Sequence, residues 1–233
     1  MNIISLKNIS KVYNEGSNEF RALKNVSLEI KEGESIAIIG KSGSGKSTLM
    51  HIMALLDTPT DGHISIDGEE STKLRRKQLD KMRNKTFGFV FQQFFMNAKD
   101  TVLDNVMVPL KIARVKYSDR KKIAMNALEQ VDLTDKAESR ANDLSGGQKQ
   151  RVCIARALVN DPKIIFADEP TGNLDSATSE KVEEILFGLN KRGITLIIVT
   201  HDEELAAKCS RQIRLKDGKI IEDSAQRKVK NEK

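Results

Sequence analysis

Eight residues near the start of the chain, from Gly40 to Ser47, fit the pattern G-x-x-x-x-G-K-[ST] of a phosphate-binding loop. The apolar run 35–39 predicts a buried strand before the loop, and 48–56 predicts a helix after it. A plain Gly/Ser turn is the alternative, but the order strand, loop, helix is the context that the motif requires. These residues therefore predict a phosphate-loop α/β fold.

Each part of the loop has an expected role. Glycines let backbone N–H groups curl around phosphate oxygens, and the dipole of the following helix favours negative charge. We expect Lys46 to reach the outer phosphates of a nucleotide and the Ser47 hydroxyl to bind Mg²⁺. The expected nucleotide-binding residues of the loop are Gly40, Ser42, Gly43, Ser44, Gly45, Lys46, Ser47 and Thr48.

The bulk composition limits the class of protein. The 233 residues, 39% of them hydrophobic, suffice for one large domain or a domain with a subdomain. No apolar run approaches the roughly 18 residues that cross a bilayer, and no secretion signal is visible at the start. Cys153 and Cys209 lie in stretches that look helical and form no metal-spaced pair, so we expect reduced thiols in the cytosol.

The net charge of +6 is spread unevenly. Residues 71–86 carry seven Lys or Arg against one Asp, and the tail 224–233 carries four against one Glu. Such runs can bind nucleic acid or anionic lipid, but a solvated helix face and a basic terminus explain them more simply. With two Tyr and no Trp there is little equipment for base stacking, so no nucleic acid partner is expected.

Apolar periodicity predicts the order of the elements. Alternating residues near the start predict half-exposed antiparallel strands. Residues 101–159 are predicted to be helical, with a capping-box pattern at Thr101 that opens one helix and Pro109 that distorts or ends it. Continuous apolar strands that alternate with a helix predict a parallel sheet covered on both faces, and the chain closes with a hairpin. The predicted later segments are strands 164–167 and 194–199, helix 176–190 and hairpin 213–221. The fold class is a P-loop NTPase core with a parallel sheet, an N-terminal antiparallel β subdomain and an inserted α-helical subdomain.

Acidic residues and a histidine follow the predicted parallel strands. Asp168 and Glu169 end the strand at 164–167, where ligands of parallel α/β sheets lie. Asp168 suits the outer shell of Mg²⁺, and Glu169 is placed to deprotonate an attacking water, unless the pair is only an exit into solvent. His201 follows the next strand and is expected to hydrogen-bond the γ-phosphate, whereas an isolated histidine is more often structural.

The segment 144–148 reads Leu-Ser-Gly-Gly-Gln before a helix predicted at about 149–159. Ser145 and Gln148 form a capping-box pattern. On the residues alone, the segment is either a well-capped helix start or a second anion-binding helix N-terminus.

This segment is also the signature sequence of the ATP-binding cassette family of ATPases, which the chain resembles from residue 2 to about 222. Other motifs of that family follow in order. Tyr13 stands where the family stacks an aromatic ring on adenine, and Gln92 occupies the glutamine-loop position near Mg²⁺ and the attacking water. Asp175 lies in the loop that crosses between partner subunits, and His201 matches the switch histidine.

The resemblance implies a mechanism. Two copies pair head to tail, and each ATP lies between the phosphate loop of one copy and the signature helix of the other. Ser145 and the amides of Gly146 and Gly147 then grip the γ-phosphate from across the interface, and Gln148 belongs to the same binding set. ATP and Mg²⁺ are the implied cofactors, and Glu169, His201 and Gln92 the implied catalytic residues.

Several stretches narrow the resemblance to the branch with macrolide-exporter, lipoprotein-releasing and antimicrobial-peptide-resistance ATPases, namely 88–92, 105–110 and 166–175. It implies a separate transmembrane permease and a cytoplasmic protein peripheral to the inner face of a bacterial-type membrane, driving export or mechanotransmission. The alternatives are a soluble family member acting on nucleic acid or ribosomes, and the cell-division type of ATPase. One departure is that 140–143 lacks the proline common before the signature.

We expect residues 1–223 to form the ATPase domain and 224–233 a basic tail. Within it, 1–93 and 160–223 would form the nucleotide-binding core with the antiparallel β subdomain, and 94–159 the helical signature subdomain. Phe87, Phe89 and Phe91 alternate as core residues of a strand. The loop residues Phe94 and Phe95 either line a groove for a helix of the permease or pack in the ordinary way.

Overall fold

The computed structural model describes residues 1–15 and 18–225, so most of the basic tail lies outside the described residues. Contacts divide the chain into two units, Met1–Leu79 with Thr195–Lys233, and Asp80–Ile194.

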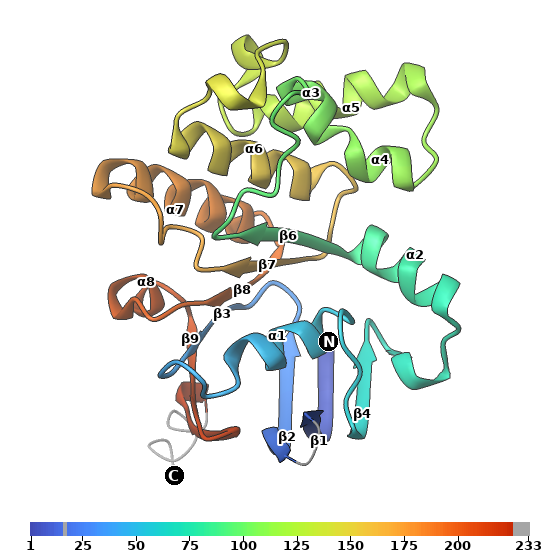
Figure 1. Cartoon of the computed structure of the whole chain (residues 1–233), viewed down its shortest axis with the longest axis vertical. Coiled ribbons are helices and arrows are strands. Elements are labelled where there is room, and N and C mark those ends of the chain that lie inside the picture. The colour runs from blue at the N-terminus through green and yellow to red at the C-terminus, as the bar shows by residue number, and fades with distance from the viewer. Residues whose placement is uncertain (16–17, 226–233) are drawn as a thin grey trace. The chain divides into compact units, whose positions relative to one another are not determined.

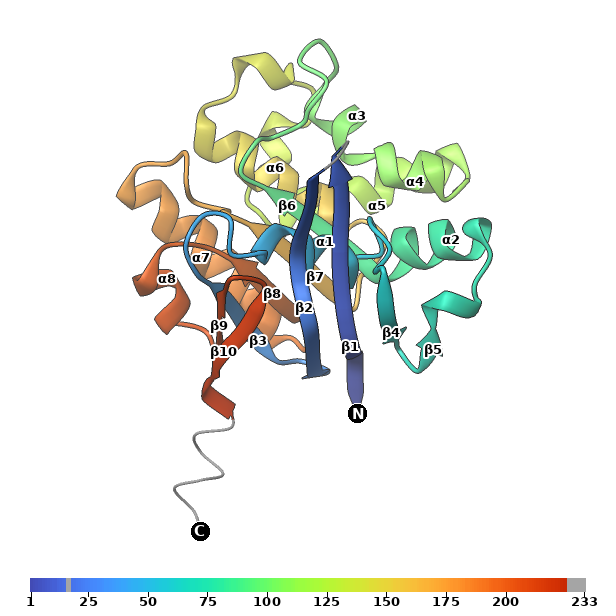
Figure 2. The ribbon, with the colours of Figure 1, turned by 60° about the horizontal axis from the view of Figure 1, so that its bottom comes forward.

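The first unit contains an antiparallel sheet with strand order β2-β1-β4-β5 (Figure 2). Leu6 pairs with Leu28 on one side and Ile64 on the other, and all three are buried. The alternation of apolar and polar residues therefore puts one face of the sheet in the core, as the sequence predicts. The strands are β1 Asn2–Glu15, β2 Asn18–Lys31, β4 Asp61–Ile66 and β5 Glu69–Glu70.

The same unit holds strands in the order β10-β9-β3-β8. Strand β3 pairs in parallel with β8 and β9, and every residue of β3 and β8 is buried. Asp217 and Gly218 both have positive φ and close the β9–β10 hairpin, which confirms the predicted turn. The elements are β3 Ser35–Ile39, α1 Lys46–Met53, 3₁₀ turn η1 Ser71–Lys73, β8 Thr195–Val199, α8 Glu203–Ala207, β9 Arg211–Lys216 and β10 Lys219–Asp223.

Strands β6 and β7 of the second unit pair in parallel, and helix α6 packs against β6 and against α3, α5 and α7 (Figure 1). The first unit ends inside α2, which buries no residue, as expected of a solvated basic helix. The elements are α2 Arg76–Thr86, β6 Phe87–Phe91, α3 Val102–Val106, α4 Val108–Ile112, α5 Tyr117–Glu129, η2 Thr134–Lys136, η3 Ala141–Asp143, α6 Gly146–Leu158, β7 Ile164–Asp168 and α7 Ser176–Lys191.

The structure confirms the predicted cap at Thr101 and gives more detail on Pro109 and on the phenylalanines of β6. Thr101 accepts a hydrogen bond from the Asp104 N–H at 3.0 Å, as its predicted capping position requires. The helix that it opens ends at Val106, before Pro109, and Pro109 lies in the first turn of the next short helix. Phe87, Phe89 and Phe91 share one face of β6, because side chains two residues apart on a strand point the same way. Phe87 is buried, but the stacked rings of Phe89 and Phe91 are only half-buried, so the cover of this face decreases toward the end of the strand.

The two cysteines are free and buried. Cys153 lies in α6 as predicted, whereas Cys209 follows the end of α8 and is not helical. Burial raises the pKa of the Cys153 thiol to about 11 and that of Cys209 to about 12. Both therefore stay protonated at neutral pH. Across residues 1–15 and 18–225, no helix is long and apolar enough to cross a membrane.

Candidate functional site

The phosphate loop leads directly into the N-terminus of α1. Gly45 precedes the helix in a left-handed conformation with φ 101°, and a Cβ there would lie 2.5 Å from the Ala22 carbonyl oxygen. Only glycine fits this turn. Lys46 Nζ lies over the loop and donates to the carbonyl oxygens of Gly40 at 2.8 Å and Lys41 at 3.1 Å. The ammonium group thus lies where phosphate oxygens are expected.

The hydroxyl groups of the loop differ in environment. Ser44 Oγ is buried and finds no hydrogen-bond partner among the described residues. A buried orphan of this kind is unusual, and a phosphate oxygen would satisfy it. Ser47, in the first turn of α1, is exposed and Thr48 is half-buried.

Tyr13 is anchored near the end of β1. Its hydroxyl donates to Asp57 Oδ2 at 2.8 Å, and Lys11 Nζ lies 2.7 Å from Asp57 Oδ1 and 4.8 Å from the centre of the tyrosine ring. Burial, then the bond to Asp57, raises the pKa of Tyr13. The ring is held in one orientation by two residues that sequence reasoning missed, because the contact with Asp57 spans 44 positions and carries no motif.

His201 is exposed at the carboxyl end of β8, as predicted. The next residue, Asp202, caps α8 by accepting from the N–H groups of Glu204 and Leu205. Thr200 Oγ1 accepts from the Asp202 N–H at 3.0 Å. The backbone on either side of the histidine is therefore fixed by the strand and by the helix cap.

In the second unit, the ends of β6 and β7 bring two predicted residues to one edge. Phe91 pairs with Asp168, so Gln92 and Glu169 both follow the paired ends of these strands. Glu169 has φ 45°, a conformation that costs a non-glycine residue free energy, and its carbonyl accepts from the Gly172 N–H at 3.1 Å. Such strain is common at functional turns.

Gln92 contacts the loop that follows β7. Its Nε2 donates to Asn173 Oδ1 at 3.3 Å, and Asn173 Nδ2 donates back to the Gln92 carbonyl at 3.0 Å. Asp175 caps α7 by accepting from the Thr178 N–H at 2.9 Å, and this backbone bond lowers the pKa of its carboxyl. One continuous segment thus carries the expected base, the partner of Gln92 and the expected crossing residue.

The signature segment begins α6 with the predicted capping box. Ser145 Oγ accepts from the Gln148 N–H at 3.3 Å, and Gln148 Oε1 accepts from the Ser145 N–H at 2.9 Å. Ser145 and Gly146 are exposed, but Gly147 is buried. A Cβ at Gly147 would lie 2.0 Å from Thr178 Cγ2, so this glycine is required by packing between α6 and α7.

The predicted residues therefore fall into two sets. Tyr13, the phosphate loop and His201 belong to the first unit. The second unit carries Gln92, Asp168, Glu169, the segment 145–148 and Asp175. Within the described parts of the chain, no three His, Cys, Asp or Glu side chains gather into a metal-holding group.

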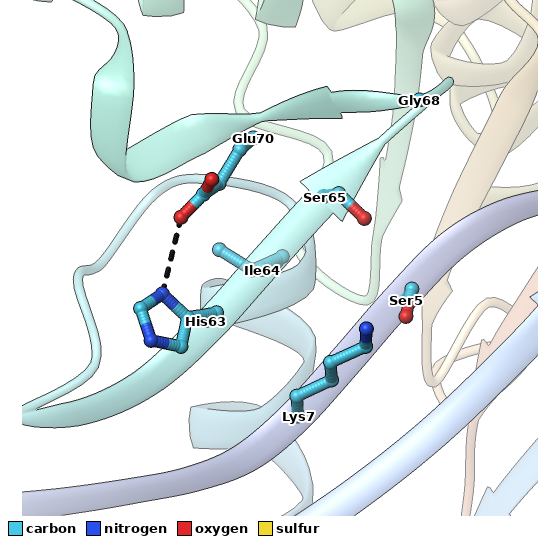
Figure 3. Close-up of a pocket in the computed structure, with 7 residues that line it drawn as sticks. All are labelled: Ser5, Lys7, His63, Ile64, Ser65, Gly68 and Glu70. Carbon is cyan, nitrogen blue, oxygen red and sulfur yellow. Dashed lines mark hydrogen bonds and ion pairs between the residues drawn. The ribbon is translucent and has the colours of Figure 1, made fainter.

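A separate polar pocket lies on the outer face of the antiparallel sheet (Figure 3). His63 Nδ1 lies 3.1 Å from Glu70 Oε1, and Lys73 Nζ lies 2.6 Å from Glu70 Oε2. The hydrogen bond from Lys73, then that from Thr72, lowers the pKa of Glu70 to about 2. His63 is thus engaged away from the phosphate loop.

Comparisons with known proteins agree with this geometry. A family model described as ABC transporter matches residues 23–172. The macrolide export ATP-binding/permease protein MacB of Aggregatibacter actinomycetemcomitans is 48% identical over 99% of this chain, which spans 36% of that protein. The lipoprotein-releasing system ATP-binding protein LolD of Geobacter metallireducens is 46% identical over 95% of this chain and 99% of its own length.

A solved structure agrees as well. The ATP-binding cassette MJ0796, in a dimeric post-hydrolysis state bound to ADP and Pi, superposes with a TM-score of 0.86 at 45% identity, covering 94% of this chain and 97% of that one.

The chain belongs to the ABC transporter family of ATP-binding proteins. The expected fold class is confirmed, and ATP hydrolysis fits a neighbour captured with its products. Within the family, relatives named MacB and LolD confirm the branch that the sequence indicates. The readings based on nucleic acid, ribosomes or cell division are not favoured.

Proposed function

We propose that this chain binds and hydrolyses ATP as one of two identical subunits that drive a separate membrane permease. The phosphate loop carries the proposal, because left-handed Gly45, overlying Lys46 and the orphaned Ser44 hydroxyl together suit a phosphate group. The dimeric MJ0796 structure supports the pairing of two copies. ATP closure of such a pair would supply the mechanical work, since the γ-phosphate binds the closed state better than the open one.

In this proposal each residue has a defined task. Lys46 and the N–H groups of the loop bind the phosphates, and the Tyr13 ring stacks on the base. Glu169 accepts the proton of the attacking water and Gln92 orients that water, while His201 donates to the γ-phosphate.

The side-chain oxygens of Ser47 and Gln92 would hold Mg²⁺, with Asp168 in its outer shell. A hydroxyl, a carboxylate and an amide are the hard ligands that this ion prefers. When bound, it would neutralise charge on the phosphate oxygens.

The signature residues act on the nucleotide of the second copy. The exposed Ser145 and Gly146 at the start of α6 offer a hydroxyl and a backbone amide to its γ-phosphate. Gly147 and Gln148 complete that helix start, and Asp175 lies in the crossing loop.

The proposed partner is a membrane permease, and the names of the relatives MacB and LolD support this proposal. Phe95 offers a contact for it, since 66% of its surface is exposed although its ring packs edge-on against Phe91. The chain would then act at the inner face of the membrane. We also retain the division into a core of 1–93 and 160–223, a signature subdomain of 94–159 and a basic tail.

Glu169→Gln tests the proposal. The variant keeps the shape of the side chain but loses the base, so ATP should bind and turnover should fall roughly 10²- to 10⁴-fold. Light scattering during size exclusion should show a dimer with ATP and a monomer without it. Glu184→Gln, an exposed acid on α7, is the matched control and should behave like the parent protein. A Glu169→Gln protein that binds ATP but stays monomeric contradicts the proposed pairing.

A further inference from the structure

A side-chain amide on helix α6 bonds to the backbone beside both Gln92 and Glu169. Gln150 Nε2 donates to the Phe91 carbonyl at 3.3 Å and to the Pro170 carbonyl at 2.6 Å. Phe91 ends β6 immediately before Gln92, and Pro170 immediately follows Glu169. A single NH₂ group thus ties together the chain segments that carry both residues.

The burial of Gln150 argues against a role in packing alone. The residue is 1% exposed, and its Oε1 accepts no hydrogen bond from any described residue. An unpaired buried acceptor costs about 1–3 kcal/mol, so an apolar side chain of the same length would serve packing better. The two N–H groups are therefore the useful part of this side chain.

The next turns of α6 extend the same contact along the loop after Gln92. Cys153 Sγ donates to the Phe94 carbonyl at 3.1 Å, and Arg156 donates to the carbonyls of Phe94 at 2.9 Å and Phe95 at 2.8 Å. Phe95 is held in a left-handed conformation with φ 42°. One face of α6 therefore fixes the backbone from Phe91 to Phe95.

We propose that Gln150 is a positioning residue for hydrolysis. Its amide holds the ends of β6 and β7 at one spacing, so that Gln92 and Glu169 address the same water molecule. Gln150 follows Gln148 by two residues in the same helix, so a displacement of the signature segment is transmitted through α6 to the backbone beside the base. This inference rests on the proposed roles of Gln92 and Glu169.

Gln150→Met tests it, because methionine keeps the length of the side chain and removes both donors. We expect kcat to fall about 10- to 100-fold, since small misplacements of reacting groups are costly, while KM and the Kd for ATP stay within about twofold. Steady-state ATPase assays and calorimetry with ATP give these values. Gln150→Asn keeps the amide on a shorter stem that cannot reach both carbonyls, and should give an intermediate kcat. If the methionine variant fails to fold, the kcat of Gln150→Asn tests the inference in its place.

The matched control is Asn160→Leu near the other end of α6. Asn160 Nδ2 also donates to two oxygens, Asn84 O at 3.0 Å and Asn84 Oδ1 at 3.1 Å, but neither adjoins the proposed catalytic residues. Asn160→Leu also removes a side-chain amide that bonds to two oxygens, and it should leave kcat unchanged whatever it does to the thermal midpoint. Equal kcat in both variants, or a loss of ATP affinity in step with kcat, overturns the inference. An active Glu169→Gln protein would instead overturn the proposed function itself.

Discussion

Lys46 shows at the scale of one residue how the loop prepares for an anion. Its ammonium group bonds only to carbonyl oxygens of the loop, at 2.8 and 3.1 Å, in the contacts that the structure gives for it. Lys46→Ala removes a charged donor, so ATP should bind roughly 10- to 100-fold more weakly by calorimetry. Lys41→Ala, which removes an exposed side chain of the same loop, should leave the Kd nearly unchanged. Undiminished binding by the Lys46 variant would refute the phosphate-loop assignment.

The residues that sequence reasoning found are those that a local motif identifies. Lys46, Ser145 and Glu169 stand at fixed positions relative to glycines, caps and strand ends. Sequence reasoning did not find Asp57 or Gln150, because their partners are far away in the chain. Asp57 bonds to Tyr13, and Gln150 bonds to the carbonyl oxygens of Phe91 and Pro170. A contact that only the fold creates leaves no local pattern to read.

At the scale of the elements, Gly147 sets the packing of α6 against α7. Gly147→Ala forces a methyl group onto Thr178 Cγ2, and overpacking of this kind costs about 1–3 kcal/mol. Adding Thr178→Ser removes the clashing methyl but keeps the hydroxyl that donates to Asp175 Oδ2 at 2.9 Å. The double variant should recover the urea midpoint of the parent protein, whereas Thr178→Ser alone should be nearly neutral. Failure of the serine to restore stability would show that the contact with Thr178 is not the cause.

Whole elements were predicted well wherever apolar periodicity was strong. The buried strands β3, β7 and β8, the α7 helix and the β9–β10 hairpin lie close to their predicted ranges. The helical region 101–159 was predicted as a type but not in its division, because the boundaries of α3 and α4 depend on short caps and on Pro109.

At the scale of the whole molecule, Arg211 and Asp223 couple stability to pH. Arg211 makes two bonds to the carboxylate, at 2.8 and 2.7 Å, and also pairs with Glu34 at 3.3 Å. Burial, the largest single effect, raises the pKa of Asp223. The hydrogen bonds from Arg211 and the Ala225 N–H, with the charge of Arg211, together outweigh it, so the pKa of Asp223 lies below its ordinary value. The stability from this group is therefore complete above about pH 3.9 and is lost as the pH falls through the folded pKa.

Asp223→Asn removes the charge that pairs with Arg211, so it should lower the free energy of unfolding by about 1–3 kcal/mol at pH 7. The expected loss is no larger because Arg211 keeps Glu34 as a partner. Urea titrations from pH 7 to pH 3 should show the difference from the parent protein shrinking below about pH 3.9. Glu222→Gln, a more exposed position on the same strand, is the control and should cost less than about 1 kcal/mol. A difference that stays constant down to pH 3 would contradict this account.

The two shielded thiols make the chain convenient for spectroscopy. Neither Cys153 nor Cys209 presents a thiolate to solvent at neutral pH, because both are buried and hold their protons to about pH 11 and 12. A single cysteine placed on the outside of α2 would therefore take a maleimide dye selectively, with the natural cysteines left in place. The approach of two subunits around a nucleotide then becomes a change in energy transfer that can be followed in real time.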